Sequence, residues 1–292
     1  MNHTRVLLLA LAIALPASRL CAQIDPPAPL RGTSTAELKG THDANDIRTE
    51  FWNFGMVGNY PPDPLNVDLT TFHSVEVPKG SGVNYSDGTT PFVLAQIDPG
   101  TGVPVYVMET GYRERQASRS NGQIMRFEPR PGYFQASTSI NAALSPAISN
   151  DPRTWPNTWP DKDHTWDGTW DGYFGKRPAA DQESFTVMDD DYYDDKQLWP
   201  NYHPDSKDLT RHGLGMRVEV RGFQWSNPES QDVIFWHYDI TNEGTVDYPA
   251  AGLGENIIFG LYMDSGVGGS AISCDGIAES DDDNAYYDNS VA

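Results

Sequence analysis

Short apolar runs that end at turn residues recur along most of this chain, and they constrain its fold more than any other feature. The runs "SVEVPKGSG", "PFVLAQIDPGTG", "VPVYVMETG" and "QIMRFEPRPG" are each closed by Gly, Pro or Asp, as strands followed by tight turns are. In "VPVYVMET", Val103, Val105 and Val107 share one face, and Tyr106 and Met108 share the other. The pattern predicts an N-terminal β region over 49–149.

Strand signals return in the last part of the chain, over 211–292. The runs "GLGMRVEVRGFQWSN", "SQDVIFWHYDITNEG" and "ENIIFGLYMDSG" have the turn spacing of a β-sandwich. In the second run, Ile234, Trp236, Tyr238 and Ile240 share a face, opposite Val233, Phe235, His237 and Asp239. We therefore predict an all-β fold, an antiparallel β-sandwich of the Ig-like or jelly-roll-like kind.

The segment 150–210 differs from its flanks, because it is rich in Trp, Tyr, Asp, Pro and Gly and poor in aliphatic residues. A structureless loop of this length is unusual inside a domain, so we expect a long irregular insertion folded over the β core. The acidic run "MDDDYYDD" within it, which includes Asp189, Asp190 and Asp191, is predicted to be a hydrated loop.

Four closely spaced tryptophans in this insertion allow two interpretations. Flat indole faces beside carboxylates can stack on sugar rings, or they can be the apolar side chains that hold a loop against the sheet. The second interpretation is favoured, since exposed aromatic patches are uncommon on soluble proteins. The candidate sugar-binding residues are Trp155, Trp159, Trp166 and Trp170.

The N-terminus has the three zones of a secretory signal peptide over 1–22. Arg5 precedes an apolar run of 12 residues, which is followed by small residues; such a run is too short for a permanent membrane span. Cleavage after Ala22 removes Cys21, so that Cys274 is the single remaining cysteine and no intramolecular disulfide can form. A lipoprotein signal with acylated Cys21 is the alternative. We expect a secreted or outer-surface protein with a flexible leader over 23–48.

The charge balance excludes one class of partner. The chain carries 20 Lys and Arg against 41 Asp and Glu, so it repels nucleic acid and anionic membranes. The acids are unevenly placed, since no Lys or Arg follows Arg221 while 13 Asp and Glu do. Basic side chains of this C-terminal segment cannot neutralise them.

Clustered carboxylates on glycine-interrupted loops near the C-terminus predict a structural calcium site. Calcium takes six to eight oxygen ligands, whereas zinc prefers His and Cys, and no His lies near this segment. A solvated acidic loop is the alternative. The predicted ligands are Asp264, Asp275, Asp281, Asp282, Asp283 and Asp288, with Glu279 and Asn284 close by.

No catalytic motif stands out. The sequence has no HExxH zinc motif, no GxSxG elbow, no P-loop and no GxGxxG after a strand. Cys274 has no local nucleophile signature, and paired carboxylates for glycoside hydrolysis give no recognisable pattern in one sequence. We expect a protein that is not an enzyme.

Several stretches together resemble large secreted surface proteins of Gram-negative bacteria, of the kind exported by the type IX system. They include "FWNFGMVGNY", "VEVRGFQWSN", "IFWHYDITNEGT" and "FGLYMDSGVGG". The resemblance implies cation-holding loops at Asp264 and at 281–283 within β-sandwich modules. The chain departs from that family in having no C-terminal sorting domain, and we expect it to be a truncated piece of a longer protein.

The leading hypothesis is thus a calcium-stabilised, non-catalytic β module with a structural or adhesive role, whose partners are other surface proteins or cell-surface polysaccharide. The rival is a carbohydrate-binding module or glycoside hydrolase that uses the tryptophan-rich segment. A peptidase is a distant third, since no motif supports it.

Overall fold

The computed structural model of the chain describes residues 30–58, 73–111, 126–191, 201–248, 257–268 and 278–279. The described residues are nearly all β, as predicted, with two short 3-10 helices, η2 (Ser34–Ala36) and η4 (Pro152–Thr154). The strands are β1 (Lys39–His42), β2 (Thr49–Trp52), β3 (Asn84–Ile97), β4 (Val105–Thr110), β5 (Glu128–Pro129), β6 (Ala147–Ile148), β7 (Gln182–Asp189), β8 (Met216–Gln224), β9 (Phe235–Asn242), β10 (Ile258–Gly268) and β11 (Ala278–Glu279).

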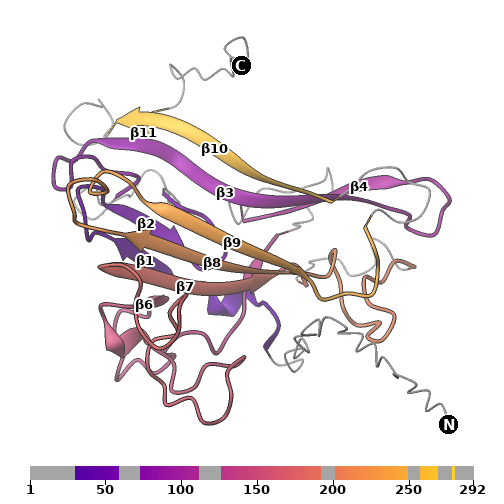
Figure 1. Ribbon diagram of the computed structural model, residues 1–292. Helices are drawn as coiled ribbons and strands as arrows, with labels where there is room; N and C mark the ends of the chain where they lie inside the picture. Colours follow the sequence, from indigo (N-terminus) through magenta and orange to yellow (C-terminus); the bar gives the residue numbers. More distant parts are fainter. Residues whose placement is uncertain are drawn as a thin grey trace, which may run out of the picture.

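The strands form two main antiparallel sheets that face each other (Figure 1). The four-stranded sheet has the order β11-β10-β3-β4, and the five-stranded sheet has the order β5-β7-β8-β9, with β6 paired to β7. A parallel bridge between Thr110 and Arg126 joins the end of β4 to the residues before β5. The two sheets therefore continue into each other on this side, and the sandwich is a curled half-barrel with β9 and β10 at its ends.

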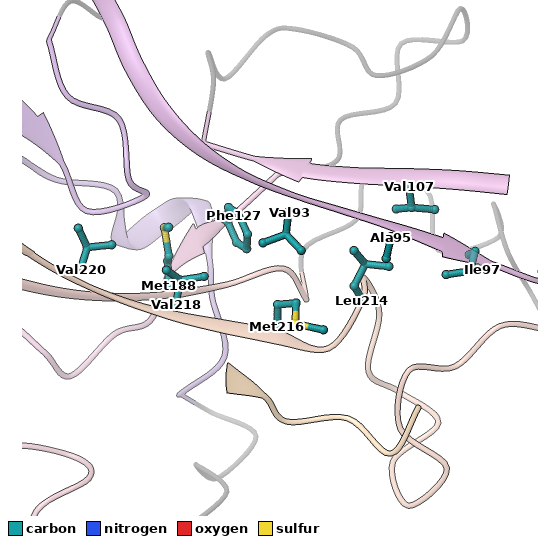
Figure 2. Close-up of a cluster of buried hydrophobic side chains, with 10 residues drawn as sticks. All are labelled: Val93, Ala95, Ile97, Val107, Phe127, Met188, Leu214, Met216, Val218 and Val220. Atoms are coloured by element: carbon teal, nitrogen blue, oxygen red, sulfur yellow. The ribbon is translucent and has the colours of Figure 1, made fainter. Parts of the chain in front are cut away.

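The main core lies between the two sheets. Alternate residues of β3 and β4 meet alternate residues of β7 and β8, because side chains of a strand point to opposite faces in turn. Figure 2 shows the cluster: Val93, Ala95, Ile97, Val107, Phe127, Met188, Leu214, Met216, Val218 and Val220. The predicted faces of β4 and β9 are confirmed, since Val107 points inward and Trp236, Tyr238 and Ile240 pack against the cluster. Val103 precedes β4 and is exposed.

A second core covers the outer face of the five-stranded sheet. Phe185 and Val187 of β7 point away from the first core and are buried beneath Tyr133 and the tryptophan-rich segment. Arg221 of β8 lies over the ring of Phe185, 3.9 Å from its centre. The irregular insertion is therefore a third layer on the sandwich, as the sequence predicted.

The predicted insertion over 150–210 also contains a strand that the sequence reading did not assign. All of β7, Gln182–Asp189, is buried, and it pairs with β5, β6 and β8. Its apolar residues lie on both faces, so the period-2 alternation that marks a half-exposed strand is absent. Because the segment ends in the acidic residues Asp189, Asp190 and Asp191, the sequence predicted a hydrated loop there.

The prediction of a flexible leader over 23–48 is corrected for its described part. Residues 39–42 form β1, which pairs with β2, and His42 is fully buried. Asn45 is buried as well, and its side-chain oxygen accepts a hydrogen bond from Gln224 at 2.7 Å. These contacts are to residues distant in the sequence, so local composition did not reveal them.

Among the described residues, no helix has the length and apolar character needed to cross a bilayer.

Candidate functional site

The outer face of the four-stranded sheet is apolar across three strands. In the register of this sheet, Leu94 of β3 lies between Met108 of β4 and Ile258 of β10, and side chains directly opposite each other across strands are in contact range. Two tyrosines flank this row at the neighbouring outward positions. We call this surface the outer apolar face; it consists of Phe92, Leu94, Tyr106, Met108, Ile258 and Tyr262.

This face is accessible to a partner. The exposed fractions of Tyr106 and Met108 are 57% and 46%, and those of Ile258 and Tyr262 are 45% and 43%. Gly260 lets the β10 backbone approach β3 closely, because a Cβ there would lie 2.3 Å from the ring of Phe92. The ring of Phe92 thus covers the gap between the two strands and keeps the face continuous.

The corresponding face of the five-stranded sheet is charged where the third layer does not cover it. The outward residues of β8 include Arg217 and Glu219, which form an ion pair at 2.6 Å, and those of β9 include His237 and Asp239. The two sheets therefore present opposite chemistry to their surroundings.

The predicted calcium ligands lie mostly outside the described residues. This holds for Asp275, Asp281, Asp282, Asp283 and Asp288. Asp264 is half-buried on β10; its backbone oxygen accepts a hydrogen bond from Ser86 at 3.2 Å, and the hydroxyl of Tyr262 donates to its Oδ2 at 3.4 Å. Across the described part of the chain, no group of three or more His, Cys, Asp or Glu is placed to hold a metal ion.

The four candidate sugar-binding tryptophans belong to the second core. Trp159 and Trp170 are 2% and 1% exposed and pack edge to face, with ring centres 5.8 Å apart. Trp155 and Trp166 are partly buried, and their indole N–H groups donate to the backbone oxygens of Ile148 and Thr169. The structure brings all four together, as side chains that attach the insertion to the sheet.

A different set of aromatic residues is exposed, and the sequence reading missed it. Phe174 is 79% exposed, and Tyr173 and Phe235 are each 49% exposed. Phe223 of β8 connects them through Trp225: its ring meets that of Tyr173 and stacks on Trp225, which packs edge to face on Phe235 with ring centres 5.6 Å apart. We call Tyr173, Phe174, Trp225 and Phe235 the exposed aromatic cluster. They come from three separate stretches: the pairing of β8 with β9 brings Trp225 near Phe235, and ring contacts with Phe223 and His237 place Tyr173 beside them.

The carboxylates of the "MDDDYYDD" run are not a hydrated loop in their described part. Asp189 and Asp190 are fully buried at the end of β7. Arg130 donates to Asp189 at 2.5 Å and makes two hydrogen bonds to Glu243, at 3.1 and 2.5 Å. We call this group, with Arg211 on Glu243 at 2.8 Å, the buried ion-pair network.

The network ties five segments together. Asp189 accepts hydrogen bonds from the backbone N–H of Gly32 at 3.1 and 3.0 Å, and Asp190 accepts from the backbone N–H groups of Leu214 and Met216. Burial raises the pKa of Asp189, against the opposing charge of Arg130. For Glu243 the hydrogen bonds and charges of Arg130 and Arg211 outweigh burial, so its pKa lies below the ordinary value. All these groups hold the fold together.

A second buried charged group lies at the continuous side of the half-barrel. Glu128 of β5 is fully buried against Arg126, with which it forms an ion pair, and Arg126 also lies 3.5 Å from Glu37. Burial raises the pKa of Glu128 to about 9, although Arg126 opposes the shift. Through Arg126, these ion pairs connect Glu37, which follows η2, to the residues at which the two sheets join.

A histidine and a serine also meet, at a place that no substrate can reach. His42 Nε2 lies 2.8 Å from Ser184 Oγ, and both side chains are buried. Burial lowers the pKa of His42 to about 4, so the ring is neutral at physiological pH. The rings of Phe51 and Trp236 pack on it at 5.0 and 5.2 Å, which makes the pair part of the core.

Comparison with known proteins returned nothing: no family model, curated protein or solved structure matches this chain. The geometry of the described residues is therefore the basis of the functional argument.

Proposed function

We propose that this chain is a non-catalytic β-sandwich module of a secreted or cell-surface protein, with a structural or adhesive role, and that it binds another protein through the outer apolar face. The exposed row of Met108, Leu94 and Ile258 across three strands carries the proposal. A contiguous apolar patch of this kind is typical of an interaction surface on soluble proteins, and the outer face of an antiparallel sheet is otherwise polar.

The composition of the face favours a protein partner over a polysaccharide. Its six residues offer no charged group; the polar groups at its margins are the hydroxyls of Tyr106 and Tyr262, Gln96 opposite Tyr106, and Asp264, which accepts from Tyr262. Polysaccharides need several hydrogen-bonding groups, whereas the centre of a protein interface is depleted of charge and enriched in Tyr and Met. The complementary surface is thus an apolar sheet face or loop of another surface protein.

The experiment uses full-length chain and intact cells of the organism that produces it. Wild-type protein is expected to bind these cells, and protease treatment of the cells should abolish the binding. The double variant Met108→Lys, Ile258→Lys places two cations on the face and should weaken binding at least about tenfold, because each lysine must lose its hydration in the interface. Val103→Lys is the matched control, since Val103 is 64% exposed and lies before β4.

Two results would overturn this proposal. Binding that the double variant retains in full would remove the outer apolar face from the interaction. Binding that survives protease treatment and is competed by soluble polysaccharide would instead support the alternative that the chain binds carbohydrate.

That alternative is favoured by one observation, the exposed aromatic cluster. Tyr173 and Phe174 meet edge to face with ring centres 4.8 Å apart, and Tyr173 also packs on His237. Exposed aromatic faces beside polar groups suit sugar rings. A glycan array with wild type and the Tyr173→Ala, Phe174→Ala variant tests it; a signal lost in the variant would support this role for the cluster.

The proposal that calcium stabilises this module is based on the sequence alone. If the C-terminal carboxylates bind calcium, the melting temperature should rise with added Ca²⁺ and fall in EDTA, because a ligand that binds only the folded state stabilises it. An identical melting temperature in both conditions would remove calcium from the proposal.

A further inference from the structure

Among the described residues, the half-barrel is open on one side, between the edges of β9 and β10. In the described residues, β9 pairs only with β8, and β10 pairs with β3 along its length but with β11 only at Val267 and Gly268. Figure 1 shows β9 and β10 on the same side of the molecule. The backbone groups of 235–242 and 258–266 therefore form two facing edges, which we call the open seam.

Apolar side chains line the inner side of this seam. Phe259 and Leu261 lie opposite the buried residues Val93 and Pro91, which places them on the inward face of β10. They are nevertheless 40% and 52% exposed, and Met263, on the same face, is 68% exposed. The inward residues of β10 are thus accessible because no strand lies beyond them on that side among the described residues.

The two edges approach each other without pairing. The rings of Tyr238 and Phe259 are in contact, with centres 5.5 Å apart, yet no backbone ladder joins β9 to β10. Paired strands lie about 4.8 Å apart, so contact through two aromatic side chains indicates a wider separation. An added strand would find hydrogen-bonding edges and an apolar inner surface at the same place.

The sequence of both edges lacks the usual protection against strand addition. Natural edge strands carry lysine or proline that discourages pairing. Neither "FWHYDITN" of β9 nor "IFGLYMDSGVG" of β10 contains a lysine or a proline. The protective features of β10 are Asp264 and two register irregularities, between Asp264 and Ser265 and between Ser265 and Gly268, and all lie towards the end of the strand.

Charge identifies the kind of strand that fits. Neither β9 nor β10 contains Lys or Arg, while Asp239 lies on β9 and Asp264 on β10, so both strands of the seam carry negative charge and no positive charge. A second copy of this acidic chain would be repelled, and a basic strand attracted. We infer that the open seam accepts an extended strand from another protein, with apolar residues at alternate positions facing Phe259 and Leu261 and with Lys or Arg between them.

This binding mode uses backbone hydrogen bonds for affinity and alternate side chains for selectivity. It is separate from the outer apolar face, because the seam uses the opposite face of β10 and its backbone edge. An occupant matching the eight residues of β9 would complete the half-barrel and bury the exposed inward residues of β10.

The test uses the full chain and a synthetic peptide of about ten residues in which Val and Lys alternate. We expect saturable binding by fluorescence anisotropy, with slowed amide exchange in 235–242 and 258–266. The same peptide with Glu in place of Lys should bind at least about tenfold more weakly. The double variant Leu261→Lys, Met263→Lys should lose binding to a similar degree, because it adds cations to the seam.

Met108→Lys is the matched control, since this residue is on the outer apolar face and should leave peptide affinity unchanged. A loss with Met108→Lys equal to that of the double variant would overturn the assignment to the seam. Absence of saturable binding, or equal affinity for the Glu peptide, would overturn it too. A wild-type dimer that the double variant abolishes, without peptide binding, would assign the seam to a second copy and contradict the inference.

Discussion

The two sheets of this sandwich are alike in having apolar residues on both faces, and they differ in what covers them. Phe185 and Val187 on the outer face of the five-stranded sheet lie beneath the tryptophan-rich layer, whereas no described residue covers Met108 and Ile258 on the four-stranded sheet. A sheet that is apolar on both faces is typical of a buried position. The first sheet is covered by residues of this chain, and we propose that a partner covers the second.

The buried end of β7 and the open seam differ in the same way. At the end of β7, each buried carboxylate has a basic or backbone N–H partner, as Asp189 has Arg130 and Gly32. At the open seam neither strand contains a basic residue, and neither contains the lysine or proline that commonly protects an edge. Internal stability is thus concentrated on one side of the molecule, and the capacity for binding on the other.

The largest expected effect tests the stable side. Arg130→Ala leaves Asp189 and Glu243 buried without their main cation, so the free energy of unfolding should fall by about 3 to 5 kcal/mol, as measured by urea denaturation. Arg153→Ala is the control, because the Arg153 side chain is 75% exposed and pairs with Asp151 on the surface; no measurable change is expected. A loss below about 1 kcal/mol for Arg130→Ala would contradict the central role of the network.

The tryptophan layer gives the next effect. Trp159→Ala should reduce the free energy of unfolding by about 3 to 4 kcal/mol, because it removes a buried indole that donates to Thr169 at 2.7 Å. Phe174→Ala, which changes a 79% exposed ring, should leave stability nearly unchanged. Equal effects for the two variants would show that the layer is not a packed core.

Acidification probes the core beside Ser184. The folded-state pKa of His42 is lowered by burial from 6.5 to about 4, so the stability that the neutral ring contributes is present above pH 6.5 and is lost as the pH falls towards 4. The loss should amount to about 3 kcal/mol. The unfolding free energy of His42→Gln should depend less on pH in this window, and identical pH profiles for variant and wild type would contradict the assignment.

The smallest expected effect lies at the open seam. Met263→Lys alters a side chain that is 68% exposed, so the free energy of unfolding should change by no more than about 0.5 kcal/mol. Thermal and urea denaturation of this variant beside Arg130→Ala give the comparison directly. A loss of several kcal/mol would show that the seam is part of the internal core and is not open to a partner.

Sequence reasoning succeeded where one face of a strand is buried and the other is not. The alternation in β4 and β9 predicted which residues share a face, and the structure places the face of Val105 and Val107 and that of Tyr238 against the core. It failed for β7, where both faces are buried and no alternation remains. It also failed for Gly32, whose partner Asp189 is 157 residues away. The predicted calcium ligands remain a prediction, since all but Asp264 lie outside the described residues.

The sequence by itself determined the β class, the residues that share a face on the alternating strands and the concentration of acids after Arg221. These are local or summed properties, which residue order and composition carry directly. Tertiary structure decided which tryptophans are buried, which aspartates are paired and which apolar face is left uncovered. Those outcomes depend on contacts between residues far apart in the chain, and hydrophobic periodicity reports only that a face is apolar, without saying what covers it.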